Sequence, residues 1–158
     1  MKERFRYNKA FKEYAVPTTE KKFQRDAKFQ YFIQCTKDHD VVLPVLDYVH
    51  QMTLCLQSYT LSVAQCNGLA RAFEYFENFI KRVIFDNCGI EDEHFAAILG
   101  GINRLKDFKK IIYRRNEFQL KSLEQMKLIL CKKIPNHLEE LRIENCKIEP
   151  FVTEKLID

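Results

Sequence analysis

An internal repeat of nearly thirty residues constrains the fold of this chain more than any other feature of its sequence. The segments 83–90 (VIFDNCGI) and 141–148 (LRIENCKI) both read apolar-x-apolar-acid-Asn-Cys-x-Ile. The segments 111–118 and 54–61 follow the same outline more loosely. Four copies therefore start at residues 54, 83, 111 and 141, with spacings of 29, 28 and 30 residues. Such a regular spacing is hard to produce by chance, and it predicts a chain built from equivalent units that stack on one another.

Each unit is predicted to contain a strand, a turn, a helix and a return loop. Every copy begins with a short alternating run, which is typical of a β-strand with one buried face. Apolar residues at the i, i+3, i+4, i+7 spacing of one helix face follow the first three runs. They are Leu69, Ala72, Phe73 and Phe76, then Phe95, Ile98, Leu99 and Ile102, then Leu123, Met126 and Leu130. A single unit cannot bury its apolar face, so we expect an α/β fold with the strands in one parallel sheet and the helices outside it.

The repeats resemble the ribonuclease-inhibitor-like class of leucine-rich repeats, whose pattern is L-x-x-L-x-L-x-x-N/C-x-L followed by a helix. Over roughly residues 50–158, the pattern is carried by Ile80, Val83, Phe85, Cys88 and Ile90, by Phe108, Ile111, Tyr113, Asn116 and Phe118, and by Leu138, Leu141, Ile143, Cys146 and Ile148. The resemblance implies a solenoid with parallel strands on its concave side and helices on its convex side. It also implies that Cys88, Asn116 and Cys146 point inward and cap backbone groups where each strand turns away. Tyr59 departs from this pattern, which implies a terminal capping unit.

The N-terminal part of the chain matches no repeat. We expect residues 1–40 to form a basic and aromatic N-terminal arm and cap, and residues 41–158 to form the solenoid, with about four repeats and the last one incomplete. Residues 1–30 carry nine basic and four acidic side chains, a net charge of +5, against +4 for the whole chain. Residues 20–35 are compatible with a helix or a strand. Residues 41–52 predict a short helix that packs on the first repeat.

The C-terminal part of the chain lacks a polar capping unit. The last predicted helix is cut short by comparison with the earlier copies, although solenoids need their exposed core edge covered. We therefore expect either a fragment of a longer repeat protein or a partner that covers this end.

The sequence contains no motif that predicts catalysis. It has no G-x-G-x-x-G, G-x-x-x-x-G-K-[ST] or H-E-x-x-H motif, and its six cysteines form no C-x-x-C pair. Cys35 and His39 come nearest to a metal half-site, but a second pair is missing. Gly100-Gly101 lies in a predicted helix, where it predicts close packing of neighbouring helices rather than phosphate binding. We expect no enzyme, no cofactor and no metal, with reduced cysteines used as small apolar residues.

The concave side of the predicted sheet is the candidate binding surface. Alternation along the strands places on it Arg82, Ile84 and Asp86, then Lys110, Ile112 and Arg114, then Glu140, Arg142 and Glu144, beside Thr53, Cys55 and Gln57 of the first copy. Ile84 and Ile112 are expected to form an exposed aliphatic pair surrounded by charged side chains, which is the composition of a protein-binding patch. An ordinary solvated sheet face is the alternative.

The function we expect is that of a non-catalytic protein-interaction scaffold, one subunit of a larger hetero-complex. It would bind other proteins through the concave face and through the N-terminal arm, whose basic and aromatic residues suit a segment that orders on an acidic partner. Simple capping of the first repeat is the alternative role of the arm. A basic nucleic-acid-binding adaptor is the rival function, although a net charge of +4 is modest and no nucleic-acid-binding module is recognisable. The interaction domain of a larger enzyme is a third alternative.

The expected location is intracellular. No stretch reaches the roughly 18 to 20 apolar residues of a membrane span. The basic start, Met1-Lys2-Glu3-Arg4-Phe5-Arg6, is followed by no apolar signal region. We therefore expect a cytoplasmic protein without a membrane partner, and the Lys-, Phe- and Ile-rich composition without tryptophan favours a cytoskeletal or ciliary (axonemal) assembly.

Overall fold

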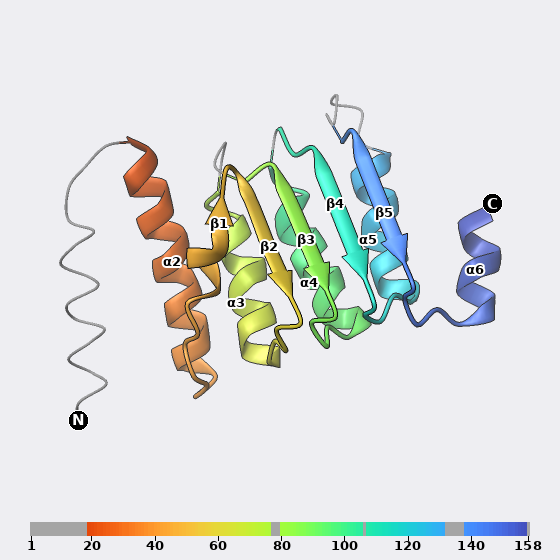
Figure 1. Ribbon diagram of the computed structural model, residues 1–158, viewed down its shortest axis with the longest axis horizontal. Coiled ribbons are helices and arrows are strands. Elements are labelled where there is room, and N and C mark those ends of the chain that lie inside the picture. Colours follow the sequence, from red (N-terminus) through yellow and green to blue (C-terminus); the bar gives the residue numbers. More distant parts are fainter. Residues whose placement is uncertain (1–18, 77–79, 106, 132–137, 158) are drawn as a thin grey trace.

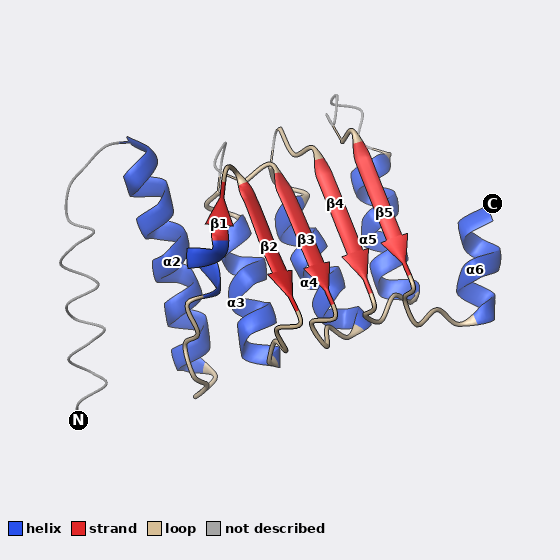
Figure 2. Ribbon diagram, viewed as in Figure 1, coloured by secondary structure: helices blue, strands red, loops and turns tan. Residues whose placement is uncertain are grey.

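Strands and helices alternate along most of the chain. The computed structural model describes residues 19–76, 80–105, 107–131 and 138–157. Its elements are α2 (Thr19–Lys37), η1 (Val45–Tyr48, a 3-10 helix), β1 (Val49–His50), β2 (Thr53–Gln57), α3 (Val63–Phe73), β3 (Arg82–Asp86), α4 (Asp92–Ile102), β4 (Lys110–Arg114), α5 (Leu120–Leu130), β5 (Glu140–Glu144) and α6 (Pro150–Ile157). From β2 onward, each strand is followed by one helix, as the repeat predicts (Figure 2).

A five-stranded sheet with the order β1-β2-β3-β4-β5 forms the centre of the molecule. The strands β2 to β5 are parallel, and β1 pairs with β2 in the antiparallel sense. The register pairs Leu54 with Val83, Val83 with Ile111, and Ile111 with Leu141, so the equivalent positions of the four copies lie side by side. Figure 1 shows α3, α4 and α5 on one face of this sheet. The predicted α/β class with a mostly parallel sheet is therefore confirmed.

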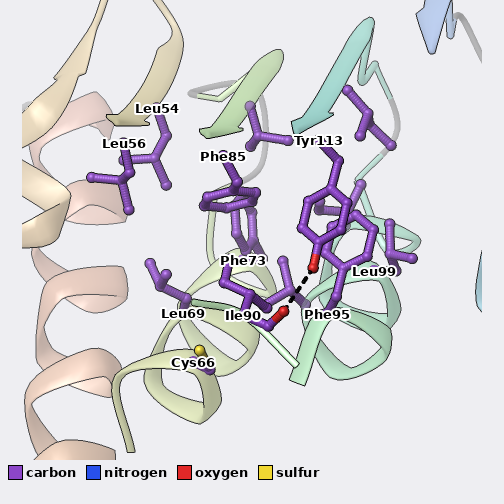
Figure 3. Close-up of a cluster of buried hydrophobic side chains, with 14 of the residues drawn as sticks. Leu54, Leu56, Cys66, Leu69, Phe73, Phe85, Ile90, Phe95, Leu99 and Tyr113 are labelled. Carbon is purple, nitrogen blue, oxygen red and sulfur yellow. Dashed lines mark hydrogen bonds between the residues drawn. The ribbon is translucent and has the colours of Figure 1, made fainter. Parts of the chain in front are cut away.

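The core lies between the sheet and this layer of helices. Alternation along β3 buries Val83 and Phe85 completely, and Phe73 of α3 and Phe95 of α4 are equally buried (Figure 3). Tyr113 of β4 stacks on Phe95, with ring centroids 3.6 Å apart and an angle of 7° between the rings. Its hydroxyl donates to the carbonyl of Glu117 at 2.8 Å, and the carbonyl of Ile90 lies 3.2 Å away. A buried tyrosine is therefore accommodated because its polar end finds backbone acceptors.

The helix α2 covers the N-terminal side of α3. Ala27, Tyr31 and Cys35 are buried at i, i+4, i+8 spacing, which is one face of a helix. A Cβ at Gly68 of α3 would lie 2.8 Å from Cδ2 of Tyr31, so the absence of a side chain at Gly68 permits this close approach. Residues 20–35, which by sequence are compatible with a helix or a strand, are thus helical. Residues 1–18 lie outside the described residues, and the binding role of the arm stays a prediction.

The predicted helix over residues 41–52 is wrong in most of its length. Only Val45–Tyr48 is helical, as the 3-10 helix η1, and β1 then forms a hairpin with β2. Val49 pairs with Leu54 and His50 pairs with Thr53, across a two-residue turn. The turn residues Gln51 and Met52 have φ of 47° and 61°, the backbone that a type I′ hairpin requires.

The two adjacent glycines of α4 differ in their surroundings. A Cβ at Gly101 would lie 2.4 Å from the carbonyl oxygen of Ala70, so α3 and α4 approach each other closely here. A Cβ at Gly100 would meet nothing nearer than Oε1 of Gln125, at 3.9 Å. The predicted close packing between helices is confirmed for Gly101 and is wrong for Gly100.

The C-terminal helices complete the described fold. In α5 the buried positions are Leu123, Met126 and Ile129, whereas Leu130, which the helical spacing assigns to the core, is 55% exposed. The reason is that the buried positions of α5 recur every three residues and so include Ile129, and Leu130 points away from this face.

The described residues contain no helix that is long and apolar enough to cross a membrane.

Candidate protein-binding face

The predicted surface residues lie together on the face of the sheet opposite α3, α4 and α5. In each strand they alternate with the residues that face the helices, and the register aligns them in three rows. The rows are Thr53, Arg82, Lys110 and Glu140; Cys55, Ile84, Ile112 and Arg142; and Gln57, Asp86, Arg114 and Glu144. We call these twelve residues the open sheet face. It includes all nine residues that the sequence assigns to partner binding.

The hairpin adds one residue to this face. His50 of β1 is the register partner of Thr53, and directly opposed residues of an antiparallel pair point to the same side. His50 is exposed. It is missing from the predicted surface because the sequence signals no turn between β1 and β2.

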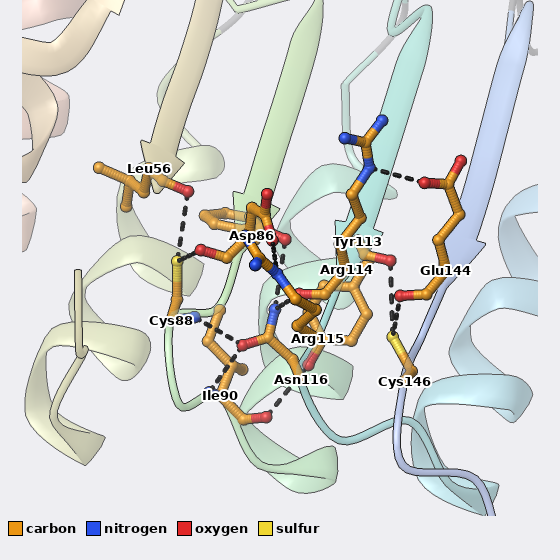
Figure 4. Close-up of polar contacts among 11 residues, drawn as sticks. Leu56, Asp86, Cys88, Ile90, Tyr113, Arg114, Arg115, Asn116, Glu144 and Cys146 are labelled. Atoms are coloured by element: carbon orange, nitrogen blue, oxygen red, sulfur yellow. Dashed lines mark hydrogen bonds and ion pairs between the residues drawn. The ribbon is translucent and has the colours of Figure 1, made fainter. Parts of the chain in front are cut away.

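Ion pairs connect β4 and β5 across the open sheet face. Lys110 Nζ lies 2.6 Å from Glu140 Oε2, and Arg114 Nε lies 2.8 Å from Glu144 Oε2 (Figure 4). Arg142 Nε lies 2.5 Å from the other carboxylate oxygen of Glu140. The hydrogen bond from Lys110 lowers the pKa of the Glu140 carboxyl below its usual value, and Arg142 acts in the same direction. This half of the face is therefore close to neutral, with its charges directed at one another.

The prediction that Ile84 and Ile112 form an exposed pair is wrong for Ile112. Ile84 is half-buried, but Ile112 is only 4% exposed. Ile112 lies between Lys110 and Arg114 on its own strand and beside Arg142 in register. We attribute its burial to the aliphatic stems of these long, paired side chains, which extend over their neighbours. Of the two isoleucines at the centre of the face, Ile84 is the one that remains accessible.

The half of the face formed by β2 and β3 is more open. Arg82 is exposed, and among the described residues no acidic side chain forms an ion pair with it. Its neighbours Cys55 and Ile84 are half-buried. A shallow hollow extends from this half to the starts of β4 and β5. It is lined by Thr53, Arg82, Ile84, Lys109, Lys110, Glu139 and Glu140. A guanidinium beside an aliphatic side chain is thus available to a partner here.

Asp86 is part of the face but is covered by a residue that the sequence does not assign to it. Arg115 Nε donates to Asp86 Oδ1 at 2.7 Å, and Asp86 is only 6% exposed. This hydrogen bond holds the pKa of the Asp86 carboxyl below its usual value. Arg115 reaches Asp86 because its backbone is left-handed, with φ of 51° directly after β4. Asp86, which the sequence assigns to the accessible surface, is therefore buried beneath the side chain of Arg115, and Arg115 itself remains exposed.

A ladder of inward-pointing side chains lies at the end of the strands, where the resemblance implies it (Figure 4). Asn116 Oδ1 accepts hydrogen bonds from the N–H groups of Cys88 at 2.8 Å and Ile90 at 3.3 Å. Its Nδ2 donates to the carbonyls of Phe85 at 3.2 Å and Arg114 at 2.8 Å. One amide thus bonds four backbone groups and joins two neighbouring units.

The cysteines of the ladder contact the equivalent carbonyls. Cys88 Sγ lies 3.3 Å from the carbonyl oxygen of Leu56, and Cys146 Sγ lies 3.5 Å from that of Tyr113. Burial raises the pKa of both thiols. Because the thiolate is the reactive form of cysteine, these two residues are placed for structure rather than for nucleophilic chemistry.

The described residues offer no metal site. Within them, no group of three His, Cys, Asp or Glu side chains is arranged to hold a metal ion. Cys66 of α3 is buried, and burial raises the pKa of its thiol to about 12. Cys131 is the exposed thiol of the described chain.

Comparisons with protein-family models, curated proteins and solved structures find no match to this chain. The structure itself shows alternating β-α units around a mostly parallel five-stranded sheet.

Proposed function

We propose that the chain is a leucine-rich-repeat-like solenoid module that binds another protein on its open sheet face. Support for the repeat class comes from the ladder of Cys88, Asn116 and Cys146, which joins units at spacings of 28 and 30 residues. Further support comes from the helices α3, α4 and α5, which cover one sheet face and leave the other accessible (Figure 1). In such folds a sheet face without helices is the natural binding surface.

The observation that carries the proposal is that the two halves of the open sheet face differ in how their charged side chains are paired. The β4 and β5 half is neutralised by the pairs Lys110–Glu140 and Arg114–Glu144. The β2 and β3 half presents the exposed Arg82 beside the half-buried Ile84 and Cys55. Arginine next to an apolar side chain is the composition of interface residues that dominate binding energy. We therefore centre the contact on Arg82 and Ile84.

The proposed role is non-catalytic. The chain would act as a scaffold subunit of a larger hetero-complex, in a cytoplasmic setting such as a cytoskeletal or axonemal assembly. The basic N-terminal arm, with five more basic than acidic side chains in residues 1–30, would provide a second contact to an acidic surface of the same complex.

Site-specific photo-cross-linking in the native complex tests this proposal. A photoreactive amino acid is placed at Arg82 or Ile84, and the matched control is placed at Glu124, which is exposed on α5. We expect one protein partner to be linked from positions 82 and 84, not from 124, and this partner to be released by Arg82→Glu. Links from 124 alone, or an Arg82→Glu variant that keeps the partner, would contradict the proposal.

Salt dependence separates the proposal from nucleic-acid binding. A protein interface with an aliphatic centre should weaken only modestly as salt rises, because few counterions are released. An RNA or DNA complex should lose affinity steeply, since each neutralised phosphate releases a counterion. A steep salt dependence together with nuclease-sensitive binding would assign the face to nucleic acid.

A further inference from the structure

The outer edge of β5 continues a series of backbone hydrogen bonds that joins the units. At the strand ends, the N–H of Ser58 donates to the carbonyl of Asp86 at 2.8 Å, and that of Asn87 donates to Arg114 at 3.0 Å. The N–H of Arg115 then donates to Glu144 at 3.1 Å. Asn145 is the next member, with a φ of 53° like the 51° of Arg115. No described residue accepts a hydrogen bond from its N–H group.

The starts of the strands form a second series. The N–H of Lys81 donates to the carbonyl of Met52, that of Lys109 to Lys81, and that of Glu139 to Lys109, each at 2.8 Å. The carbonyl of Glu139 is the next acceptor. The N–H of Glu140, the first residue of β5, donates to the carbonyl of Lys109, which directly precedes β4. The backbone groups of alternate residues in a strand point to opposite sides, so those of Leu141 and Ile143 are directed away from β4. No described strand lies there.

The side chains of this unit are also less covered than their equivalents. Ile111, Tyr113 and Phe118 in the preceding unit are fully buried, with 0% exposure. Their equivalents Leu141, Ile143 and Ile148 are only half-buried. One further strand, placed beside β5 in the register of the sheet, would therefore pair with its free backbone groups and cover its apolar side chains.

Charge decides which strand fits. On the open sheet face β5 presents Glu140, Arg142 and Glu144. A second copy of β5 paired in parallel would place each glutamate against a glutamate. An antiparallel pair about Arg142 would place Glu140 against Glu144 and Arg142 against itself. Both arrangements oppose like charges, which disfavours pairing. The strand that β5 does accept, β4, has basic residues opposite both glutamates.

We infer that the outer edge of β5 binds a parallel strand from another polypeptide, with basic side chains opposite Glu140 and Glu144 and apolar side chains facing the core. The strand would carry Asn or Cys two residues beyond its second basic residue, as β4 carries Asn116 two residues after Arg114. An asparagine there would accept from the N–H groups of Cys146 and Ile148, as Asn116 accepts from those of Cys88 and Ile90. A cysteine there would contact the carbonyl of Ile143, as Cys146 contacts that of Tyr113. The inference depends on the stacking of units and not on the binding role of the open sheet face, so either can fail alone.

The probe for this edge is a fluorescent peptide with the sequence of residues 107–120, DFKKIIYRRNEFQL, added to the whole chain. We expect it to bind and to protect the amides of Leu141, Ile143 and Asn145 from hydrogen exchange. A peptide with glutamate in place of Lys110 and Arg114 should bind at least roughly tenfold more weakly, because two cross-strand ion pairs are reversed. A peptide N-methylated at the Ile112 amide should not bind, since that group would donate to the edge.

The charge-swapped protein completes the test. Glu140→Lys/Glu144→Lys should reverse the preference and select the glutamate peptide, with circular dichroism as the check of folding. The peptide experiments leave the protein unchanged, so they remain decisive if this variant fails to fold. Equal binding of the three peptides, protection outside residues 139–148, or a dimer of the chain that buries this edge would each overturn the inference.

Discussion

The side-chain amide of Asn116 accepts a hydrogen bond from the backbone N–H of Cys88 at 2.8 Å, across two units of the sheet. Asn116 is 6% exposed, so water does not replace its partners readily. The same amide donates to Phe85 of the preceding strand. This residue therefore holds the turn of one unit against the turn of the next.

Asn116→Ala is expected to destabilise the chain by about 3 kcal/mol, because buried N–H and carbonyl groups lose their partner. Asn116→Cys is the matched comparison, since cysteine occupies the same place at positions 88 and 146. It should restore a donor toward Phe85 but no acceptor for Cys88, and so recover about half of the loss. Denaturant unfolding measures both variants. Equal stability of Asn116→Ala and the unchanged chain would contradict the assigned role.

The adjacent glycines of α4 predict opposite effects of the same substitution. Gly101→Ala places a Cβ 2.4 Å from the carbonyl oxygen of Ala70 and should cost about 2 kcal/mol or more through overpacking. Gly100→Ala meets only Gln125 at 3.9 Å and should stabilise the helix by about 0.5 to 1 kcal/mol. Thermal unfolding of the two variants checks this difference. A stabilising Gly101→Ala would show that α3 and α4 are not in contact there.

The pair of Asp86 and Arg115 predicts a loss of stability in acid. The hydrogen bond from Arg115 lowers the folded pKa of Asp86 below 3.8, its ordinary value. A depressed carboxyl pKa contributes stability that is fully present above the unfolded value and is lost as the pH falls through the folded one. The stability difference between the unchanged chain and Asp86→Asn should therefore shrink below about pH 4.

Unfolding free energies of the two chains, measured from about pH 6 to about pH 2.5, give the readout. Arg115→Gln is the control, because it removes the donor and leaves the carboxyl in place. It should flatten the same pH dependence. A difference that grows as the pH falls would contradict the lowered pKa of Asp86.

The sheet and the order of its strands follow from the sequence because the repeat spacing carries them. The repeat pattern alone aligns Leu54, Val83, Ile111 and Leu141, and these residues are register partners in the sheet. The helix α2 was less evident because Phe29 and Ile33 are apolar but 41% exposed each, which obscures the periodicity of its buried face. The hairpin of β1 and β2 gave no signal because its left-handed turn residues are Gln51 and Met52 rather than glycine or asparagine.

The sequence predicts which residues lie on the open sheet face, but it does not predict which of them are exposed. Strand alternation assigns Ile112 to that face, and the structure places it there. Its 4% exposure depends on ion pairs that Lys110 and Arg114 make with the next strand. Such pairs join residues thirty positions apart, so no local pattern of the sequence reports them. The same holds for Arg115, whose position over Asp86 follows from its backbone conformation.

The central claim is that successive units stack in register, and zero-length carbodiimide cross-linking with mass spectrometry tests it directly. Lys81 and Asp107 lie 2.6 Å apart, as do Lys110 and Glu140, and Lys121 lies 3.0 Å from Glu93. Each pair joins one unit to its neighbour, so we predict these amide cross-links in the unmodified chain. Links that skip a unit, for example from Lys81 to Glu140, in place of the predicted ones would contradict the stacked arrangement.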